Sequence, residues 1–327
     1  MILCGDFFQL PPVKKLEKTG LFQPKAIIPK DVFCFQSKSW QSCIQISFEL
    51  KIVHRQKDPE FINILNSIRI GLVTPEISEK LLATSRQRIE ENGILATQLC
   101  SHTNQADSIN KNKLESLETA TKTFEAVDSD SYLTTTLDSQ LPVPYKLILK
   151  VGAQVMLLKN LNLSNGLVNG ARGVVVKYDE GLPVVKFKNN FEYMVKPEKW
   201  LIKTPGGATL TRKQIPLKLA WAFSIHKSQG LTLDCVEMSL ANVFEAGQAY
   251  VALSRAQSMQ SLRVKDFDAK QIWASPDVLR FYKSFRRQIM DMPIPLGVRK
   301  QKKDVKSILG NLKLSKKMMD QPLMTIN

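Results

Sequence analysis

Polar and charged side chains follow an apolar run late in the chain. They are Ser224, His226, Lys227, Gln229 and Gly230. Lys227 offers a point charge for a phosphate group, and Gly230 lets the backbone approach a ligand closely. The same cluster could equally be the polar start of a helix after a buried strand, with His226 as its cap. On the residues alone, both interpretations stay open.

The segments around this cluster predict how it is positioned. The apolar run 217–223 predicts a buried strand, and the alternation over 236–240 predicts a second strand. Residues 244–257 are rich in Ala, Gln, Glu and Leu and predict a helix, while 261–264 predict a third strand. Strands that alternate with helices indicate a mostly parallel sheet. Such sheets bind ligands at the carboxyl ends of their strands, where the polar cluster lies.

Further patterns predict the other elements. The sequence Asp58-Pro59-Glu60 predicts a helix start, followed by an apolar stripe that ends at Gly71. We also expect strands over 1–4, 46–50 and 94–100, a helix from 74 to about 92, and a helix from Gln105. The aromatic residues are expected to lie in the core: Phe33, Phe35, Trp40 and Phe48.

The composition favours a basic protein with a polyanionic partner. The 327 residues allow about two domains, and 43% hydrophobic residues suffice for a sizeable core. Lys and Arg number 46 against 30 Asp and Glu, a formal net charge of +16, and the usual polyanionic partner is nucleic acid. Residues 298–327 hold eight Lys or Arg and two Asp, or +6, which leaves +10 on the rest. The folded part is therefore expected to be basic too.

The cysteines and apolar runs exclude several other classes of protein. The five cysteines are scattered without a C-x-x-C pair, and there are three histidines, so we expect neither a metal site nor a disulfide framework. This usage suits a reduced, intracellular setting. No apolar run reaches transmembrane length, and residues 1–4 have no features of a targeting segment.

Several stretches, collinear over residues 2–285, resemble motifs of superfamily-one helicases, and more narrowly of the Pif (petite integration frequency) DNA helicases. They are CGDFFQLPPV at 4–13 (third motif), HRQKDPEFINILNSIRIG at 54–71 (fourth), LCSHTNQADSIN at 99–110 (a DNA-contacting segment), VGAQVMLLKN…GLVNGARGVV at 151–175, IHKSQGLTLD at 225–234 (fifth) and QAYVALSRA at 248–256 (sixth).

The resemblance implies an α/β fold with a parallel sheet of the RecA-like, P-loop NTPase type, the second helicase domain, and an inserted small SH3-like β-barrel. Short β runs between Gly and Asn turns over 151–211 also favour a small barrel. The predicted domains are 1–45 (remnant of the first RecA-like domain and crossover), 46–150 (second RecA-like domain, first part), 151–212 (SH3-like barrel), 213–290 (second RecA-like domain, fifth and sixth motifs) and 291–327 (a basic, disordered tail).

The resemblance also implies an activity, that of an ATP-dependent DNA helicase that tracks single strands 5′ to 3′. Its cofactors would be ATP and Mg²⁺. Arg255 would be the arginine finger, with Arg55 and Gln9 beside it at the γ-phosphate. Gln229 and Gly230 would complete the ATP-binding set and couple the nucleotide to DNA. From the residues alone, Arg55 could instead form a surface ion pair, and Gln9 could be an ordinary loop residue.

The expected partner is single-stranded DNA, together with forked or structured DNA. Hydroxyl, amide and helix-start N–H groups at 102–104 suit phosphate contacts, although Asn104 could simply cap the helix. The residues that the resemblance places toward DNA are Ser224, His226, Lys227, His102, Thr103 and Asn104.

Two family motifs do not occur in the sequence. There is no GxxxxGK[ST] phosphate loop and no acidic strand-end motif for Mg²⁺, both of which the family carries before its third motif. We therefore expect a carboxyl-terminal portion of a helicase that is inactive alone, with metal ligands on the missing domain. Two alternatives stay open: a non-catalytic basic nucleic-acid-binding module, and the helicase portion of a Helitron-type transposon protein. Family analogy suggests the nucleus or mitochondrion, and DNA repair, recombination and telomere maintenance.

Overall fold

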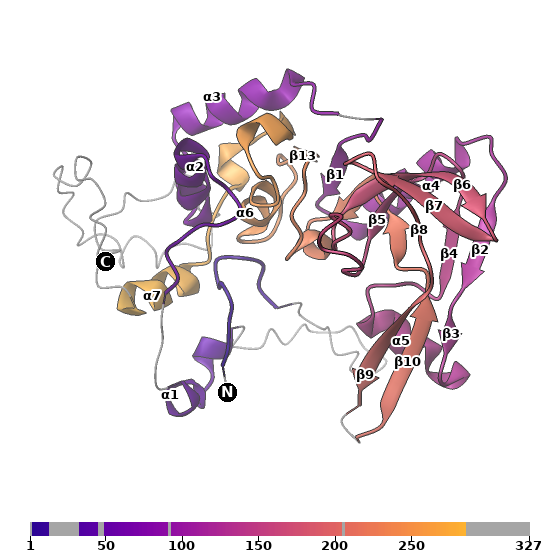
Figure 1. The fold of residues 1–327 in the computed structure, drawn as a ribbon. Coiled ribbons are helices and arrows are strands. Elements are labelled where there is room, and N and C mark those ends of the chain that lie inside the picture. Colours follow the sequence, from indigo (N-terminus) through magenta and orange to yellow (C-terminus); the bar gives the residue numbers. More distant parts are fainter. Residues whose placement is uncertain (1, 13–32, 45–48, 91–92, 205–206, 286–327) are drawn as a thin grey trace, which may run out of the picture. The chain divides into compact units, whose positions relative to one another are not determined.

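The computed structural model describes residues 2–12, 33–44, 49–90, 93–204 and 207–285, which form two units (Figure 1). The predicted tail, 291–327, and residues 46–48 of the predicted strand lie outside the described residues. The first unit contains the described residues of Met1–Leu82, Leu240–Ser254 and Phe267–Asn327, and the second contains those of Ala83–Ser239 and Arg255–Asp266.

A four-stranded parallel sheet organises the second unit, as the alternation of strands and helices predicts. Helix α4 (Thr103–Glu115) packs against β1 (Thr97–Cys100) and β12 (Ala222–Ser224). The helix begins at Thr103 rather than Gln105, with His102 as its N-cap residue, so the expectation that Asn104 caps it is wrong. The strands, in sheet order, are β12 (Ala222–Ser224), β1 (Thr97–Cys100), β13 (Val236–Ser239) and β14 (Leu262–Asp266).

The apolar run 217–223 forms two strands rather than the single one predicted. Its first part, β11 (Leu217–Leu219), pairs antiparallel with β5 (Gln154–Leu157), whereas β12 pairs parallel with β1. Ala220 N–H donates to the Gln154 carbonyl at 2.9 Å, and the Trp221 carbonyl accepts from Gln98 N–H at 2.8 Å. Adjacent residues therefore bond to different sheets, a switch that burial alone does not reveal because the run is apolar throughout.

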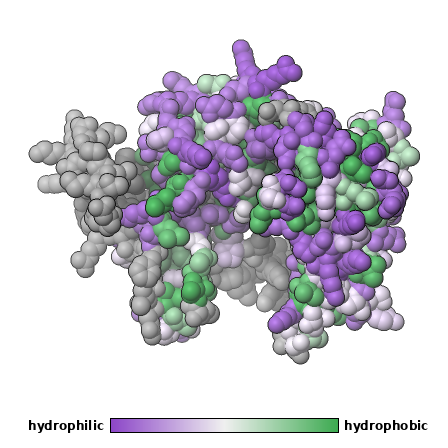
Figure 2. All heavy atoms as spheres, in the orientation of Figure 1, coloured by the Kyte–Doolittle hydropathy of each residue, from purple (hydrophilic) through white to green (hydrophobic). Residues whose placement is uncertain are grey.

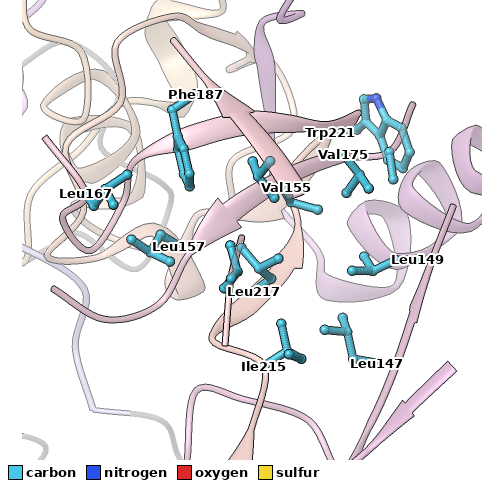
Figure 3. Packing of buried hydrophobic residues seen from close by; sticks show 13 residues of the cluster. Leu147, Leu149, Val155, Leu157, Leu167, Val175, Phe187, Ile215, Leu217 and Trp221 are labelled. Atoms are coloured by element: carbon cyan, nitrogen blue, oxygen red, sulfur yellow. The ribbon is translucent and has the colours of Figure 1, made fainter. Parts of the chain in front are cut away.

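An antiparallel sheet carries the main hydrophobic cluster of the second unit, whose packing is shown in Figure 3. Its strands, in sheet order, are β11, β5, β6 (Arg172–Asp179), β7 (Leu182–Phe187) and β8 (Glu192–Met194), and the short β runs predicted for this region are confirmed as strands. The β6–β7 turn has positive φ at Glu180 and Gly181, 47° and 81°, as a tight hairpin requires. The SH3-like barrel itself stays a prediction.

An ion cluster fixes the smaller strands of the second unit. Arg212 is fully buried and contacts Asp128 Oδ1 through Nε at 2.7 Å, and Asp138 through Nη1. These carboxylates come from the Thr-, Ser- and Asp-rich segment 116–144, which is thereby tied to β10. The elements here are β2 (Lys122–Glu125), β3 (Val127–Asp128), α5 (Thr134–Gln140), β4 (Lys146–Leu149), β9 (Glu198–Lys203) and β10 (Thr209–Gln214).

Helix α2 (Pro59–Arg69) in the first unit confirms the prediction made from its sequence. The Asp58 carboxylate accepts from Glu60 N–H at 3.0 Å, and the apolar stripe is buried. Helix α3 (Pro75–Ala83) ends earlier than predicted, at a 3₁₀ turn over Thr84–Arg86. The expected strand at 1–4 is not found over 2–4, because no described strand pairs with this segment, where Ile2 is 90% exposed.

The remaining helices of the first unit are short. Helix α6 (Gln248–Leu253) covers less than half of the predicted 244–257, because Gly247 adopts φ +74° and the Gln248 side chain accepts from Phe244 N–H at 2.9 Å. Phe33, Phe35 and Trp40 do join an aromatic cluster, around Phe7. The other two helices are α1 (Trp40–Cys43) and α7 (Pro276–Phe285).

Candidate functional site

The two segments predicted to contact DNA leave neighbouring strands of the parallel sheet. Cys100 at the end of β1 is in register with Ser224 at the end of β12, and Ile225 N–H donates to the Cys100 carbonyl at 2.9 Å. The chain continues from these ends into His102–Asn104 and into the 3₁₀ turn His226–Ser228. The second unit therefore brings the two segments to one edge of the sheet, where ligands of such sheets bind.

The helix start beside β1 offers donors to an anion. His102 has the extended conformation of an N-cap residue, with φ −118° and ψ 143°, and its side chain does not cap the helix. Its Nδ1 atom lies 3.0 Å from the Ser101 hydroxyl oxygen instead. The first-turn N–H groups of a helix point outward without intrahelical partners, and the helix dipole favours negative charge there. His102 and Asn104 are exposed at this end.

In the turn after β12, one buried residue holds the backbone in place, and other residues are exposed and available to contact a ligand. Ser224 is only 1% exposed, and its hydroxyl oxygen accepts from Lys227 N–H at 3.4 Å, so Ser224 holds the turn. Lys227 and Gln229 are exposed, and His226 is half-buried. Gly230 has φ +84° with open space around its α-carbon, so its backbone can be approached closely.

Arg255 ties the sixth motif to the fifth within the second unit. Its Nη1 atom donates to the carbonyl oxygens of Leu231 at 3.2 Å and Ser228 at 3.5 Å, the residues that bracket Gln229 and Gly230. The side chain is 2% exposed. These contacts are to backbone carbonyls, so the guanidinium shapes the turn that carries Gln229 and Gly230.

Arg55 lies in the first unit, where it contacts the residue that precedes Arg255. Its Nη1 atom donates to the Ser254 carbonyl oxygen at 2.9 Å, and the buried Gln56 donates to the same oxygen through Nε2 at 3.2 Å. Partial burial lowers the pKa of Arg55 from its ordinary value, against the opposing influence of Tyr250. Gln56 could not be identified from the sequence, because an amide beside a motif arginine has no distinctive pattern.

Gln9 follows a turn that a partly buried ion pair fixes in the first unit. Gln9 N–H donates to the Asp6 carbonyl at 3.1 Å, and Asp6 Oδ1 accepts from Arg69 Nη2 at 2.7 Å. The Arg69 guanidinium also lies over the Phe8 ring, 4.5 Å from its centroid. A Cβ atom on Gly247 would lie 2.2 Å from the Phe8 carbonyl oxygen, so this position requires glycine. Neither Arg69 nor Gly247 was identified from the sequence.

The described ranges, 2–12, 33–44, 49–90, 93–204 and 207–285, contain neither a metal-ligand cluster nor a membrane-spanning helix. Nowhere in them do three or more His, Cys, Asp or Glu side chains gather as a metal site would require. Among the same residues, no helix has both the length and the apolar character needed to cross a bilayer. Hydrophilic residues dominate the face shown in Figure 2, with hydrophobic residues scattered among them.

The parallel sheet, its packed helix and the polar turns at its carboxyl edge define an α/β protein consistent with a RecA-like fold. Residues 132–178 match the family described as DNA helicase Pif1, 2B domain. The ATP-dependent DNA helicase PIF1 of Danio rerio is 53% identical over 291 residues, which cover 88% of this chain and 44% of the relative. A crystal structure of Pif1 helicase from Candida albicans is 34% identical with a TM-score of 0.67, covering 86% of this chain and 68% of that chain.

A third comparison is the crystal structure of Pif1 helicase from Bacteroides in complex with ADP-AlF3 and ssDNA. It is 29% identical with a TM-score of 0.57, covering 87% of this chain and 66% of that chain. The chain belongs to the Pif1 helicase family. It spans less than half the length of the Danio rerio relative. The 2B match begins before residue 151, where the inserted domain was predicted to start.

Proposed function

We propose that this chain provides the second helicase domain of an ATP-dependent DNA helicase that moves 5′ to 3′ along single strands. One observation carries this proposal: the segments at 102–104 and 226–230 meet at the carboxyl edge of β1 and β12, and Arg255 holds the second of them. An arginine that bonds to the DNA-side turn suits an enzyme in which nucleotide state must alter DNA contacts.

The residues present fit the phosphate end of a nucleotide. Arg55 is a partly exposed guanidinium, which matches phosphate oxygens in a planar fork, and Gln9 is a neutral amide that can orient water. Bound ATP would supply the phosphoryl group whose transfer to water releases the free energy for movement. The family resemblance, rather than any arrangement of the two units, assigns Arg255 to the charge that develops there, and Arg55 and Gln9 to the γ-phosphate and the attacking water. The ligands of Mg²⁺ belong to family motifs that this sequence does not contain.

Single-stranded DNA is the proposed partner of the sheet edge. Lys227 would bind a backbone phosphate as an exposed point charge, and the N–H groups after His102 would bind another. The Bacteroides helicase named above was crystallised with ssDNA, which supports this assignment. By analogy with the family, we further propose action on forked DNA, in genome maintenance, in the nucleus or mitochondrion.

The test is single-strand binding by the chain as it stands. We would measure fluorescence anisotropy of a labelled oligothymidine with wild type, Lys227→Ala and the matched control Lys213→Ala, an exposed lysine on β10. Both substitutions remove one positive charge. We expect Lys227→Ala to raise Kd by about five- to tenfold, and Lys213→Ala to change it less than twofold, because one well-placed phosphate contact contributes about 1 kcal/mol or more. If both variants raised Kd by the same factor, the binding would depend on the overall positive charge alone, which would contradict the proposed site.

A further inference from the structure

Lys218 is a cation in an unusual place. It is the middle residue of β11, opposite Met156 of β5, within an otherwise apolar run. Its side chain is partly buried, and its ammonium lies 4.1 Å from the centroid of the Phe223 ring. Lysine is among the residues that are least often buried without a partner, so this position calls for an explanation.

The surroundings of Lys218 disfavour the protonated, charged form of its side chain. Burial, and to a smaller extent repulsion from Lys227, lowers the pKa of Lys218 to about 8. Of the described residues, none that is acidic contributes to this pKa. Phe223 and Met156, its neighbours on β12 and β5, carry no charge, and Lys227 on the 3₁₀ turn is the charged group that acts on it. Buried charges in proteins are normally paired, which indicates that the partner of Lys218 is a ligand.

We propose that Lys218 is a second phosphate-binding lysine of the DNA site, which acts with Lys227 on one backbone phosphate of single-stranded DNA. Two ammonium groups that repel each other in the free protein both gain an attractive partner when an anion enters between them. The Phe223 ring holds the ammonium by a cation–π contact until then. Phosphate is the ligand because Lys227 belongs to the turn already assigned to DNA, so this inference rests on the proposed function.

A proton-linked affinity follows from this arrangement. A bound phosphate raises the pKa of Lys218 again, so the complex keeps a proton that the free protein loses above about pH 8. Affinity is therefore fully present below this pH and declines as pH rises through it. Ordinary lysines, with pKa values near 10.4, produce no such decline between pH 7 and 9.

The experiment compares pH profiles of binding at constant ionic strength. We would measure anisotropy with a rhodamine-labelled oligothymidine from pH 7 to 9 for wild type, Lys218→Gln, Lys218→Arg and the control Lys213→Gln. We expect Kd of the wild type and of Lys213→Gln to rise by about tenfold, since one titrating group with a pKa two units higher in the complex gives that change. Lys218→Arg should bind like wild type at pH 7 without the decline, because arginine stays charged.

The Lys218→Gln variant allows the inference about Lys218 to be tested separately from the proposed function. Lys218→Gln should bind weakly at pH 7 with a flat profile, and thermal unfolding should show that it melts no lower than wild type, because a buried charge has been removed. A wild type that binds without a decline, or a decline that persists in Lys218→Gln, would overturn this inference alone. Failure of the wild type to bind single strands at pH 7 would overturn the proposed function as well.

Discussion

The Nη1 atom of Arg255 lies 3.2 Å from the carbonyl oxygen of Leu231, so the arginine of the sixth motif bonds to the backbone of the fifth. Its second acceptor, the carbonyl of Ser228, lies at the start of the same turn. These two acceptors give the guanidinium a defined place beside the turn. In the proposed enzyme, a phosphate that draws Arg255 away releases the turn carrying Gln229 and Gly230. In that proposal, the exchange would link nucleotide binding to the DNA contacts.

Replacing Arg255 tests this link in a protein that also carries the first helicase domain. We expect Arg255→Ala to lower kcat for ATP hydrolysis by about 10³-fold or more, the range known for arginine fingers. Single-strand binding should weaken by a much smaller factor, since Lys227 remains although the turn loses the hydrogen bonds from Arg255. Steady-state ATPase at saturating DNA, beside anisotropy on the same proteins, gives both values. A variant that keeps more than about a tenth of wild-type kcat would remove Arg255 from this role.

The close packing around Gly247 in the first unit leads to a prediction about stability rather than catalysis. A methyl group there would lie 2.2 Å from the Phe8 carbonyl oxygen and 2.8 Å from that of Gln9, and φ is +74°. We expect Gly247→Ala to lower the free energy of unfolding by about 1–3 kcal/mol, from strain at a positive φ together with this overlap. Urea unfolding monitored by circular dichroism measures this change. The control is Gly93→Ala, which also has positive φ, +76°, but open space around the α-carbon, so it should show the φ cost alone.

The ion cluster of Arg212 predicts how stability depends on pH. The hydrogen bond from Arg212 holds the pKa of Asp128 below its ordinary value of 3.8, and Thr134 adds to this effect. A depressed carboxyl pKa contributes stability above the unfolded value, which is lost as pH falls through the folded value. At pH 7, Asp128→Asn should lower the free energy of unfolding by about 3 kcal/mol, since it leaves a buried guanidinium short of a partner.

The Asp138→Asn variant is the control for this measurement of the free energy of unfolding. Asp138 contacts the same guanidinium but has a side chain that is 45% exposed, against 3% for Asp128. Asp138→Asn should therefore cost less, about 1 kcal/mol or below. For Asp128→Asn, the difference from wild type should shrink as pH falls below about 4. Equal costs for both variants, or a difference independent of pH, would contradict the assigned role of Asp128.

The sequence predicted correctly those helices and hairpins that are determined by residues within the element itself. Helix α2 carries its own cap and apolar stripe, and the β6–β7 hairpin carries its own turn residues, so both were predicted correctly. The strand expected at 1–4 and the full length of the helix expected at 244–257 were wrong, because pairing partners and a glycine close to Phe8 decide these features. Such contacts join residues far apart in the sequence.

The candidate site shows the same division. The carboxyl-edge position of Lys227 was predicted, since strand order along the chain implied it. Arg69, Gln56 and Lys218 were missed, because an arginine on a helix, an amide beside a motif and a lysine in a strand have no distinctive spacing. Their roles depend on Asp6, Ser254 and Phe223, which only the folded chain places beside them.

The two strands formed by residues 217–224 also have a mechanical consequence. Between Leu219, bonded in the antiparallel sheet, and Ala222, bonded in the parallel sheet, there are only Ala220 and Trp221, and both are buried. This connection contains no loop. We therefore expect a displacement of the antiparallel sheet to move Ser224 and the turn after it. The position of the turn that carries Lys227 therefore depends on the antiparallel sheet as well as on the parallel one.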